Sequence, residues 1–438
     1  MASDARRATV GDYVALVRGT TYKGQLVGEP GPALLGLGSI EPGGGFRTGN
    51  YKTYGGDCPD ELMLFPGHIY ASLKGATKDG KMIGSVARVP PSVPTGRLTQ
   101  DTVKLVFRTP DPEDATYLYW VLRTPQYRDY CAGHAMGSAV VALSRRDFLS
   151  YPVPPPTTER RRVVTLLDAI EEKTELNRRM NETLEAMARA LFKSWFVDFD
   201  PVRAKSEGRD PGLPEPIADL FPARLVDSEL NGIPEGWQVA PLPEVVEVNP
   251  TRALRKGVEA PYLDMANMPT RGHSADEVID RAFGSGMRFI KGDTLVARIT
   301  PCLENGKTAF VDFLQEGQVG WGSTEYIVLR PKAPLPEEYG YCLARSAEFR
   351  EFAIQSMTGT SGRQRVPAEL LAHFRVAVPP KPIAEAFGRA VKPRFARASA
   401  AVREARTLAA LRDALLPMLI SGDLRATSAV QHEMDRVL

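Results

Sequence analysis

Several short segments of this 438-residue chain contain residue types that nucleotide chemistry uses, but their spacing does not support it. Gly306-Lys307-Thr308 matches the end of a P-loop, yet Pro301 stands where that motif requires its first glycine. The residues after Thr308 read as a strand, whereas a P-loop leads into a helix whose N-terminus binds phosphate. Leu35-Gly-Leu-Gly38 has no suitably spaced acidic residue after it, so we interpret it as a turn.

The histidines and cysteines, which could hold a metal ion or attack a substrate, are scattered along the chain. They are His68, His134, His273, His373 and His432, and Cys58, Cys131, Cys302 and Cys342. Their positions do not give the paired spacing of a metal site, and the sequence has no Gly-x-Ser-x-Gly elbow. We therefore expect no catalytic residue and no metal site on this chain. The isolated cysteines favour reduced thiols in a cytoplasmic protein.

The composition is that of a globular protein with more than one domain. Hydrophobic residues make up 43% of the sequence and charged residues 25%. At roughly 100–200 residues per domain, this length predicts two to four domains. No apolar run approaches the roughly 18 residues of a membrane span, and we expect no membrane association. Since 55 basic residues face 53 acidic ones, the net charge is only +2, and any nucleic-acid-binding surface has to be local.

The second half of the sequence repeats the first. The segments that begin at Gly67, Tyr117 and Leu149 correspond to those that begin at Gly292, Tyr339 and Phe374. The offsets are 225, 222 and 225 residues, and such near-constant offsets indicate a duplicated unit. Each copy has short runs typical of strands, then a short aromatic helix, then a proline stop. In the second copy the predicted strands are 294–299, 308–313 and 326–329.

A long helix is predicted after each proline stop. Between Leu166 and Leu191 the apolar positions step by four and three residues, which is the seven-residue period of a coiled coil. A helix over 157–196 would be roughly 60 Å long at 1.5 Å per residue. The second helix, about 383–420, contains Pro393, which we expect to kink or break it. An isolated helix with an apolar stripe is poorly stable in water, so we expect the two stripes to bury each other.

Local charge identifies candidate DNA-contacting residues in matching places of the two copies. They are Lys74, Lys78 and Lys81 on a glycine-rich loop of the first copy, Arg298 and Lys307 in the matching loop of the second, and Arg363, Gln364 and Arg365 on another turn. Arginine suits bidentate contact with guanine, glutamine suits adenine, and lysine suits phosphate. For any one of these residues, a solvated surface charge is the alternative.

Two similar globules connected by long helices favour a protein that reads a divided DNA target. If each globule reads a few base pairs, the helices fix the separation of the two readings along the duplex. The bases themselves do not follow from the sequence, because DNA shape contributes specificity without direct contacts.

Four parts of the sequence carry a family resemblance. They are Gly292–Lys307 together with Gly322–Pro331, then Leu191–Arg203, Ile233–Trp237 and Leu416–Gly422. With these segments the chain resembles, over essentially all of its length, the specificity (S) subunit of type I restriction-modification systems, which serve in phage defence.

The resemblance implies an α+β fold with a pseudo-two-fold internal repeat. Two similar mixed α/β target-recognition domains would be joined by two long antiparallel helices that form a coiled coil, which acts as spacer and docking platform. The implied boundaries are 1–155 and 235–380 for the recognition domains, 156–197 and 381–422 for the helices, 198–234 for a connector and 423–438 for a C-terminal tail.

The resemblance also implies partners. The chain would bind double-stranded DNA, two methyltransferase (M) subunits that use S-adenosylmethionine to methylate adenine at N6, and restriction (R) subunits that use ATP and magnesium. It would itself be non-catalytic and hold no cofactor. An aromatic cluster fits a docking surface for an M subunit, with core at a helix end as the equal alternative: Phe192, Trp195, Phe196 and Phe199.

Three other readings stay open at this point. The chain could serve as the recognition subunit of a type II-like or other defence assembly. It could be a self-contained DNA methyltransferase, which tight binding of S-adenosylmethionine would reveal. It could also be a scaffold without a DNA role, for which weak and salt-insensitive DNA affinity would be typical.

Overall fold

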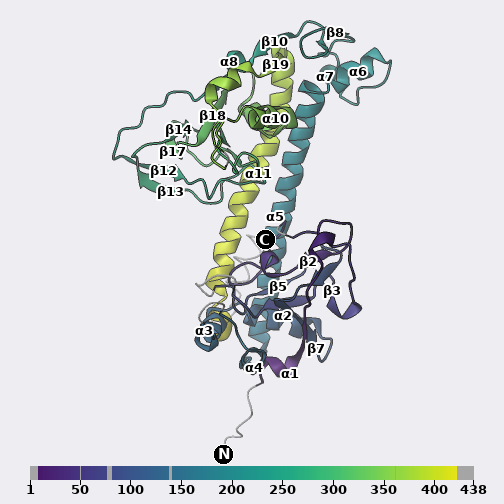
Figure 1. The fold of residues 1–438 in the computed structure, drawn as a ribbon, viewed down its shortest axis with the longest axis vertical. Coiled ribbons are helices and arrows are strands. Elements are labelled where there is room, and N and C mark those ends of the chain that lie inside the picture. Colours follow the sequence, from purple (N-terminus) through teal and green to yellow (C-terminus); the bar gives the residue numbers. More distant parts are fainter. Residues whose placement is uncertain (1–7, 50, 76–80, 138–140, 361, 422–438) are drawn as a thin grey trace, which may run out of the picture. The chain divides into compact units, whose positions relative to one another are not determined.

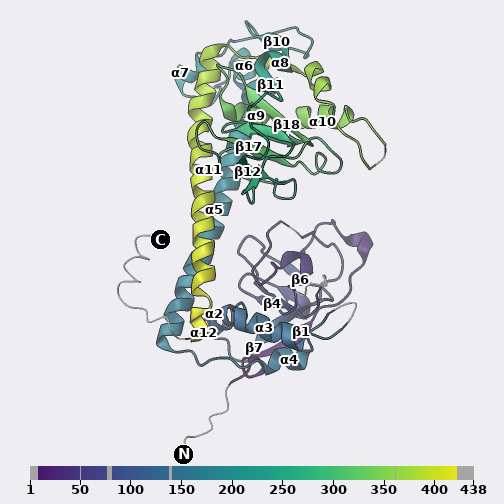
Figure 2. The same cartoon turned by 90° about the vertical axis from the view of Figure 1, so that its left-hand side faces the viewer.

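The computed structural model describes residues 8–421 except 50, 76–80, 138–140 and 361. The predicted tail 423–438 and the candidate Lys78 therefore lie outside the described residues. The chain divides into two compact units, shown in Figures 1 and 2. The first unit comprises Met1–Thr174 and Thr407–Leu438, and the second comprises Glu175–Arg406. Each unit contains part of each long helix, so these limits differ from the domain limits expected from the sequence.

The first unit is built on an antiparallel sheet whose strand order is β1-β7-β4-β5, and on a smaller sheet with the order β2-β6-β3. In the smaller sheet β2 and β6 are parallel. The strands are β1 (Val14–Arg18), β2 (Ala33–Leu35), β3 (Met63–Leu64), β4 (Ile69–Ser72), β5 (Val86–Arg88), β6 (Gly96–Leu98) and β7 (Thr102–Phe107). The helices are α1 (Val10–Tyr13), α2 (Pro112–Val121), α3 (Pro125–His134), α4 (Arg145–Ser150) and the start of α5 (Thr158–Phe196).

Local sequence signals begin the short helices of the first unit. Both α2 and α3 have proline in their first turn, where its missing N–H costs no helical hydrogen bond. The Asp111 side chain accepts from the Glu113 main-chain N–H, and Thr124 accepts from Tyr127 in the same way. The fully buried Trp120 packs in the core of this unit.

The second unit repeats the strand order of the antiparallel sheet of the first and has a larger second sheet. Its antiparallel sheet has the order β11-β18-β15-β16, and its other four-stranded sheet has the order β13-β12-β17-β14 with β12 and β17 parallel. The strands of these two sheets are β11 (Val246–Val248), β12 (Glu259–Leu263), β13 (Ile279–Ala282), β14 (Met287–Ile290), β15 (Thr294–Ala297), β16 (Thr308–Phe310), β17 (Val319–Gly322) and β18 (Tyr326–Pro331). Thus β11, β18, β15 and β16 take the places of β1, β7, β4 and β5.

The remaining elements of the second unit surround these sheets. They are α6 (Asp200–Ser206), α7 (Glu215–Ala218), β8 (Leu225–Val226), β9 (Ile233–Pro234), β10 (Gln238–Pro241), α8 (Leu242–Val245), α9 (Glu337–Arg345), α10 (Ala347–Gln355), a 3-10 turn at Ala368–His373, β19 (Arg375–Val378) and α11 (Lys381–Leu415), whose end lies in the first unit and is followed there by α12 (Met418–Ser421). The connector expected at 198–234 folds into the second unit, where Val202 and Phe221 are buried in its core.

The helices α5 and α11 pack against each other within each unit. In the first unit Leu166 and Ile170 of α5 form a buried cluster with Leu408 of α11. In the second unit the Asn177 amide donates to Glu404 of α11 over 3.0 Å. Farther along α5 in that unit, the ring centroid of Phe196 lies 4.9 Å from that of Phe387 near the start of α11. The two helices therefore run antiparallel in the second unit.

Of the kink or break expected at Pro393, the break is wrong, because α11 is one helix from Lys381 to Leu415. Proline removes one main-chain donor and crowds the preceding turn, which favours a break in an isolated helix. Here Val391, Phe395 and Ala398 on either side of it are buried. This packing holds the helix through the proline.

Candidate nucleic-acid interface

Two loops of the second unit are joined by main-chain hydrogen bonds. One follows β15 and the other precedes the 3-10 turn at Ala368–His373. The Val366 N–H donates to the Arg298 carbonyl over 2.9 Å, and the Thr300 N–H donates to the Gln364 carbonyl over 3.0 Å. The fold thus brings together three predicted DNA-contacting residues, Arg298, Gln364 and Arg365. We refer to residues 298–300 and 358–366, without 361, as the second loop pair.

A single carboxylate holds both of the inner arginines of the second loop pair. The Arg365 Nε donates to Glu325 Oε1 and Oε2 over 2.8 and 3.0 Å, and the Arg298 Nε lies 3.5 Å from Glu325 Oε2. The Arg298 main-chain N–H also donates to the Glu325 carbonyl. The Arg365 side chain is 42% exposed and that of Glu325 is 23% exposed, so the arginine is the more accessible of the pair. Arg363 is exposed on the same turn, and these four side chains carry a net charge of about +2.

Lys307, the other predicted residue of the loop after β15, bonds to main-chain carbonyls. Its ammonium group donates to the main-chain carbonyls of Met265 and Ala266, at 2.5 and 3.2 Å. The side chain is half-buried and ties two internal segments together. These bonds help to stabilise the loops, and contact of Lys307 with DNA stays a prediction.

The first unit contains the same pair of loops. The Leu143 N–H donates to the Leu73 carbonyl over 2.9 Å, and the Gly75 N–H donates to the Val141 carbonyl over 2.8 Å. Lys74 and Ala142 form the isolated β-bridge that corresponds to the one between Ile299 and Arg365. We refer to the described residues among 73–75 and 136–143 as the first loop pair.

A lysine–aspartate pair flanks the first loop pair. The Lys74 ammonium donates to Asp101 Oδ1 over 2.8 Å, and the lysine is 44% exposed. Asp101 immediately precedes β7, just as Glu325 immediately precedes β18. Lys81 is exposed, and its carbonyl accepts from the Arg128 guanidinium. Asp101 and Glu325 were not predicted from the sequence, although Glu325 lies inside Gly322–Pro331, which carried the family resemblance.

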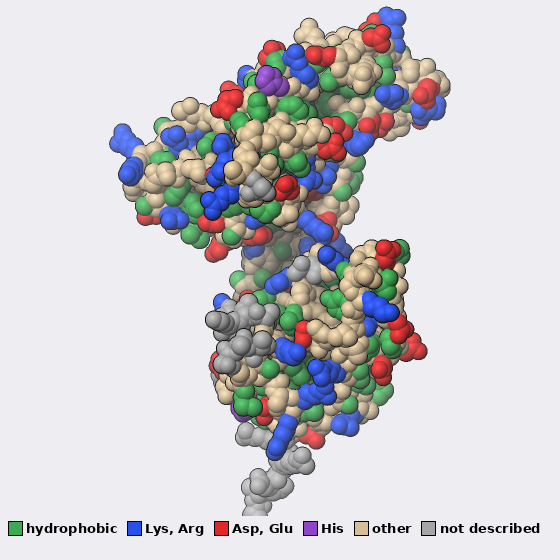
Figure 3. Space-filling view, in the orientation of Figure 1, with side chains coloured by type: hydrophobic (Ala, Val, Ile, Leu, Met, Phe, Trp, Pro, Cys, Tyr) green, Lys and Arg blue, Asp and Glu red, His purple; other side chains and the backbone are tan. Residues whose placement is uncertain are grey.

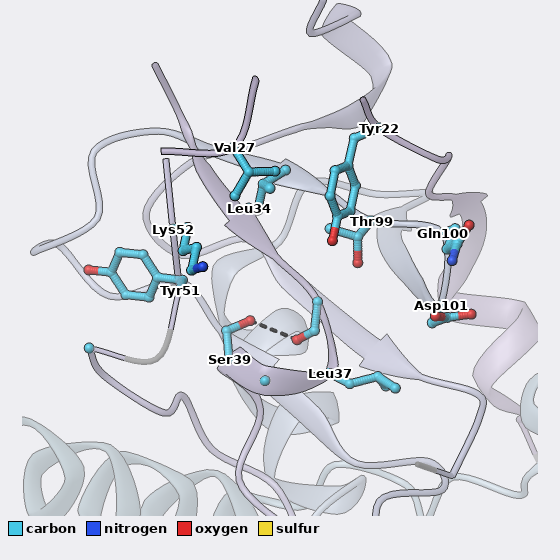
Figure 4. Close-up of a pocket in the computed structure, with 13 residues that line it drawn as sticks. Tyr22, Val27, Leu34, Leu37, Ser39, Tyr51, Lys52, Thr99, Gln100 and Asp101 are labelled. Carbon is cyan, nitrogen blue, oxygen red and sulfur yellow. Dashed lines mark hydrogen bonds between the residues drawn. The ribbon is translucent and has the colours of Figure 1, made fainter. Parts of the chain in front are cut away.

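A cavity of about 460 Å³ opens beside Asp101 in the first unit (Figure 4). Tyr22, Tyr51, Lys52 and Gln100 line it, together with the turn Gly36–Ser39. Leu37–Ser39 is a short 3-10 turn, in which the Ser39 hydroxyl donates to the Gly36 carbonyl over 2.8 Å. The glycine segment is thus a turn, as its sequence indicates. The cavity offers aromatic faces, an amide and an ammonium group, which are groups that suit nucleic acid.

Buried ion pairs hold the sheet of the first unit to α5. Arg88 donates to both Asp168 oxygens over 2.8 and 3.0 Å and to Glu171 over 2.8 Å. Arg123, whose side chain is 4% exposed, donates to Glu171 over 2.6 Å. Burial by itself raises the pKa of Glu171, but the charges of Arg123 and Arg88 and their hydrogen bonds outweigh it and lower the pKa. This network fixes the position of α5 on the unit that carries the first loop pair.

The structure corrects the prediction that the aromatic cluster forms a docking surface. Phe192, Trp195, Phe196 and Phe199 are 3%, 2%, 7% and 5% exposed and belong to the core of the second unit. Trp195 packs on Phe221 of the connector with ring centroids 5.1 Å apart. Because the connector folds over these rings, they present no surface to a partner, and the alternative of a core at the helix end describes them.

Three further observations concern surface charge, metal binding and membrane-spanning helices. Figure 3 shows Lys and Arg side chains interspersed with Asp and Glu on the visible face of each unit. Among the described residues, no group of three or more His, Cys, Asp or Glu side chains is arranged to hold a metal ion. Over the same residues, no helix has the length and hydrophobicity of a membrane span.

Taken together, the fold is of a mixed α/β class, with the same order of antiparallel strands in both units and two long helices. No family model matches the chain. The type I restriction enzyme MjaIX specificity subunit of Methanocaldococcus jannaschii is 25% identical over 341 residues, which cover 73% of this chain and 72% of that protein. The HindI specificity subunit of Haemophilus influenzae is 22% identical over 324 residues, covering 63% and 69%.

One solved structure agrees with these sequence relatives. The type I restriction-modification S subunit from M. genitalium superposes with a TM-score of 0.53 over 96% of this chain and 98% of that one, at 13% identity. The structural match supports the fold, and the sequence matches support the relationship. The resemblance found in the sequence is confirmed: the chain is a homologue of the specificity subunits of type I restriction-modification systems.

Proposed function

We propose that this chain is the DNA-recognition subunit of a type I restriction-modification complex and reads an asymmetric target in two halves. The observation that carries the proposal is the presence of one loop pair in each unit, with the same hydrogen-bond pattern and different side chains. Two recognition sites that share a loop structure but carry different side chains would recognise two different short DNA sequences. In addition, its homologues are named as specificity subunits.

The proposal assigns the chemistry to other subunits. Two M subunits would bind S-adenosylmethionine and methylate adenine, and R subunits would use ATP and magnesium. This chain would be non-catalytic, and α5 and α11 would act as spacer and docking platform. The packing of these helices supports a stiff spacer, because Leu166 and Ile170 of α5 are buried against Leu408 of α11 and Asn177 donates to Glu404.

The proposal is tested by mapping methylated adenines in the host genome with and without the gene. We expect a bipartite, asymmetric methylated motif that is lost when the gene is deleted and restored when it is returned. A motif that persists without the gene would contradict the proposal. Titration of S-adenosylmethionine onto the purified chain is the companion measurement, and tight binding there would favour a self-contained methyltransferase instead.

A further inference from the structure

The two loop pairs can be matched position by position through their hydrogen bonds. Leu143 bonds to Leu73 as Val366 bonds to Arg298, and Gly75 bonds to Val141 as Thr300 bonds to Gln364. The bridge from Ala142 to Lys74 matches the bridge from Arg365 to Ile299. Thus Val141 and Ala142 in the first unit occupy the places of Gln364 and Arg365 in the second.

The matched sites share a carboxylate and differ in the basic groups that it holds. Asp101 and Glu325 are each the last residue before the second strand of their antiparallel sheet, β7 or β18. Asp101 holds Lys74 from the first loop, whereas Glu325 holds Arg298 from the first loop and Arg365 from the second. The carboxylate therefore stands at the same position in both units, whereas the basic side chains that it pairs with differ.

We propose that Glu325 and Asp101 are positioning residues of two quasi-equivalent base-reading sites, in which the carboxylate aims a basic side chain of the loop pair at the DNA. This inference rests on the proposed function. In the second site Arg365 contacts a guanine edge, for which the guanidinium has matching donors. In the first site the Lys74 ammonium donates to a guanine edge as a compact charge on a flexible stem, without the fork geometry of arginine.

The negative charge of the carboxylate distinguishes a residue that positions a basic side chain from one that attracts DNA. A carboxylate beside a DNA-binding loop repels phosphates, so it lowers non-specific affinity. Glu325 offsets this cost by accepting a bifurcated hydrogen bond from the Arg365 Nε–H, which restrains the guanidinium. A restrained guanidinium has fewer orientations to lose on binding, and it favours the base that matches it. Removal of the carboxylate should therefore raise non-specific affinity and weaken discrimination together.

The experiment compares Glu325→Gln, Asp101→Asn and wild type in the complete complex, with the methylated motif as the readout. We expect Glu325→Gln to relax one guanine position in one half of the motif, with a loss of discrimination of about 5- to 100-fold. Asp101→Asn should relax the other half only. Non-specific binding to a randomised duplex, measured by fluorescence anisotropy, should become tighter in both variants.

Controls separate positioning from a loss of folding or charge. Glu337→Gln removes a carboxylate that pairs with Arg330 in the same unit, outside the loop pair, and should leave the motif unchanged. Glu325→Asp keeps the charge and should retain the preference of wild type in large part. Thermal unfolding of each variant reports its folding.

The possible outcomes distinguish failure of the proposed function from failure of this inference alone. A wild-type chain that directs no motif would overturn the proposed function and this inference with it. A wild-type motif that Glu325→Gln leaves unchanged, in a folded variant, would overturn the inference alone. Equal loss of both halves in one variant, or weaker non-specific binding, would also contradict positioning.

Discussion

At the scale of single residues, the second loop pair offers arginines with different degrees of restraint. Arg365 is held by Glu325, whereas Arg363 is exposed on the turn. A held guanidinium can select a base edge, and an exposed one can contribute phosphate affinity. Both arginines belong to the second unit, so their effect should be confined to the half of the target that this unit reads.

Replacing Arg363 and Arg365 together with alanine should weaken sequence-selective binding at one half-site only. Loss of one bidentate contact costs about 1–3 kcal/mol of discrimination. The measurement is binding of the complete complex to duplexes in which one half-site at a time is substituted. Equal loss at both half-sites would contradict two independent readers.

Removal of Glu171 should weaken the first unit, because its carboxylate pairs with Arg123 and Arg88. Glu171→Ala leaves the Arg123 guanidinium, which is 4% exposed, without its ion partner. We expect a loss of about 3 kcal/mol in the free energy of unfolding, the lower end of the range for a broken buried pair. Denaturant unfolding followed by circular dichroism measures it. As a control, Glu113→Ala breaks the exposed pair with Arg161 and should cost under about 1 kcal/mol. Equal losses of unfolding free energy in the two variants would contradict a larger contribution from Glu171.

The lowered pKa of Glu171 predicts a pH dependence of stability. Its contribution is fully present above the pKa of the unfolded chain, roughly 4.3, and is lost as the pH falls through the lower pKa of the folded state. The difference in unfolding free energy between wild type and Glu171→Gln should therefore shrink as the pH falls below that value. A difference that stays constant with pH would show that the charge of Glu171 contributes nothing.

At the scale of elements, the sequence predicted periodic structure well. The predicted strands at 294–299 and 326–329 correspond to β15 and β18, because β-branched and aromatic residues between glycines and prolines mark short buried strands. The helix expected at 157–196 corresponds to α5, since a seven-residue apolar period is a local signal.

The sequence could not predict features that depend on distant packing. An aromatic cluster such as that around Trp195 fits a core or a surface, and only the fold of the connector decides between them. Likewise Glu325 meets Arg365 across 40 residues of sequence, so the pair has no local signal. The basic loops themselves were predictable because glycines and lysines mark exposed loops, but the hydrogen bond from Lys307 to the distant Met265 carbonyl was not.

Asn177 on α5 tests how the helix pair is held together in the second unit. Its side chain is 1% exposed and donates to Glu404 across the helix interface. Asn177→Ala should lower the free energy of unfolding by about 1–2 kcal/mol, because it removes a hydrogen bond to a charged group. A double-mutant cycle with Glu404→Ala isolates the pair. Strict additivity in that cycle would show that the bond does not contribute.

At the scale of the whole molecule, we propose that a helical spacer separates two recognition sites that share one loop structure. The spacer role rests on the proposal that α5 and α11 set the separation of the two half-sites. A polar seam residue such as Asn177 fixes the register of a helix pair, so both helices have to be lengthened together to preserve it.

Insertion of one heptad into each of α5 and α11, at facing positions, therefore tests the central claim most directly. Seven residues add about 10 Å of helix, which corresponds to about three base pairs of DNA. The methylated motif of the host, mapped with this variant in place of wild type, should keep both half-sites and gain a longer spacer. An unchanged spacer in an active, folded variant would contradict the account.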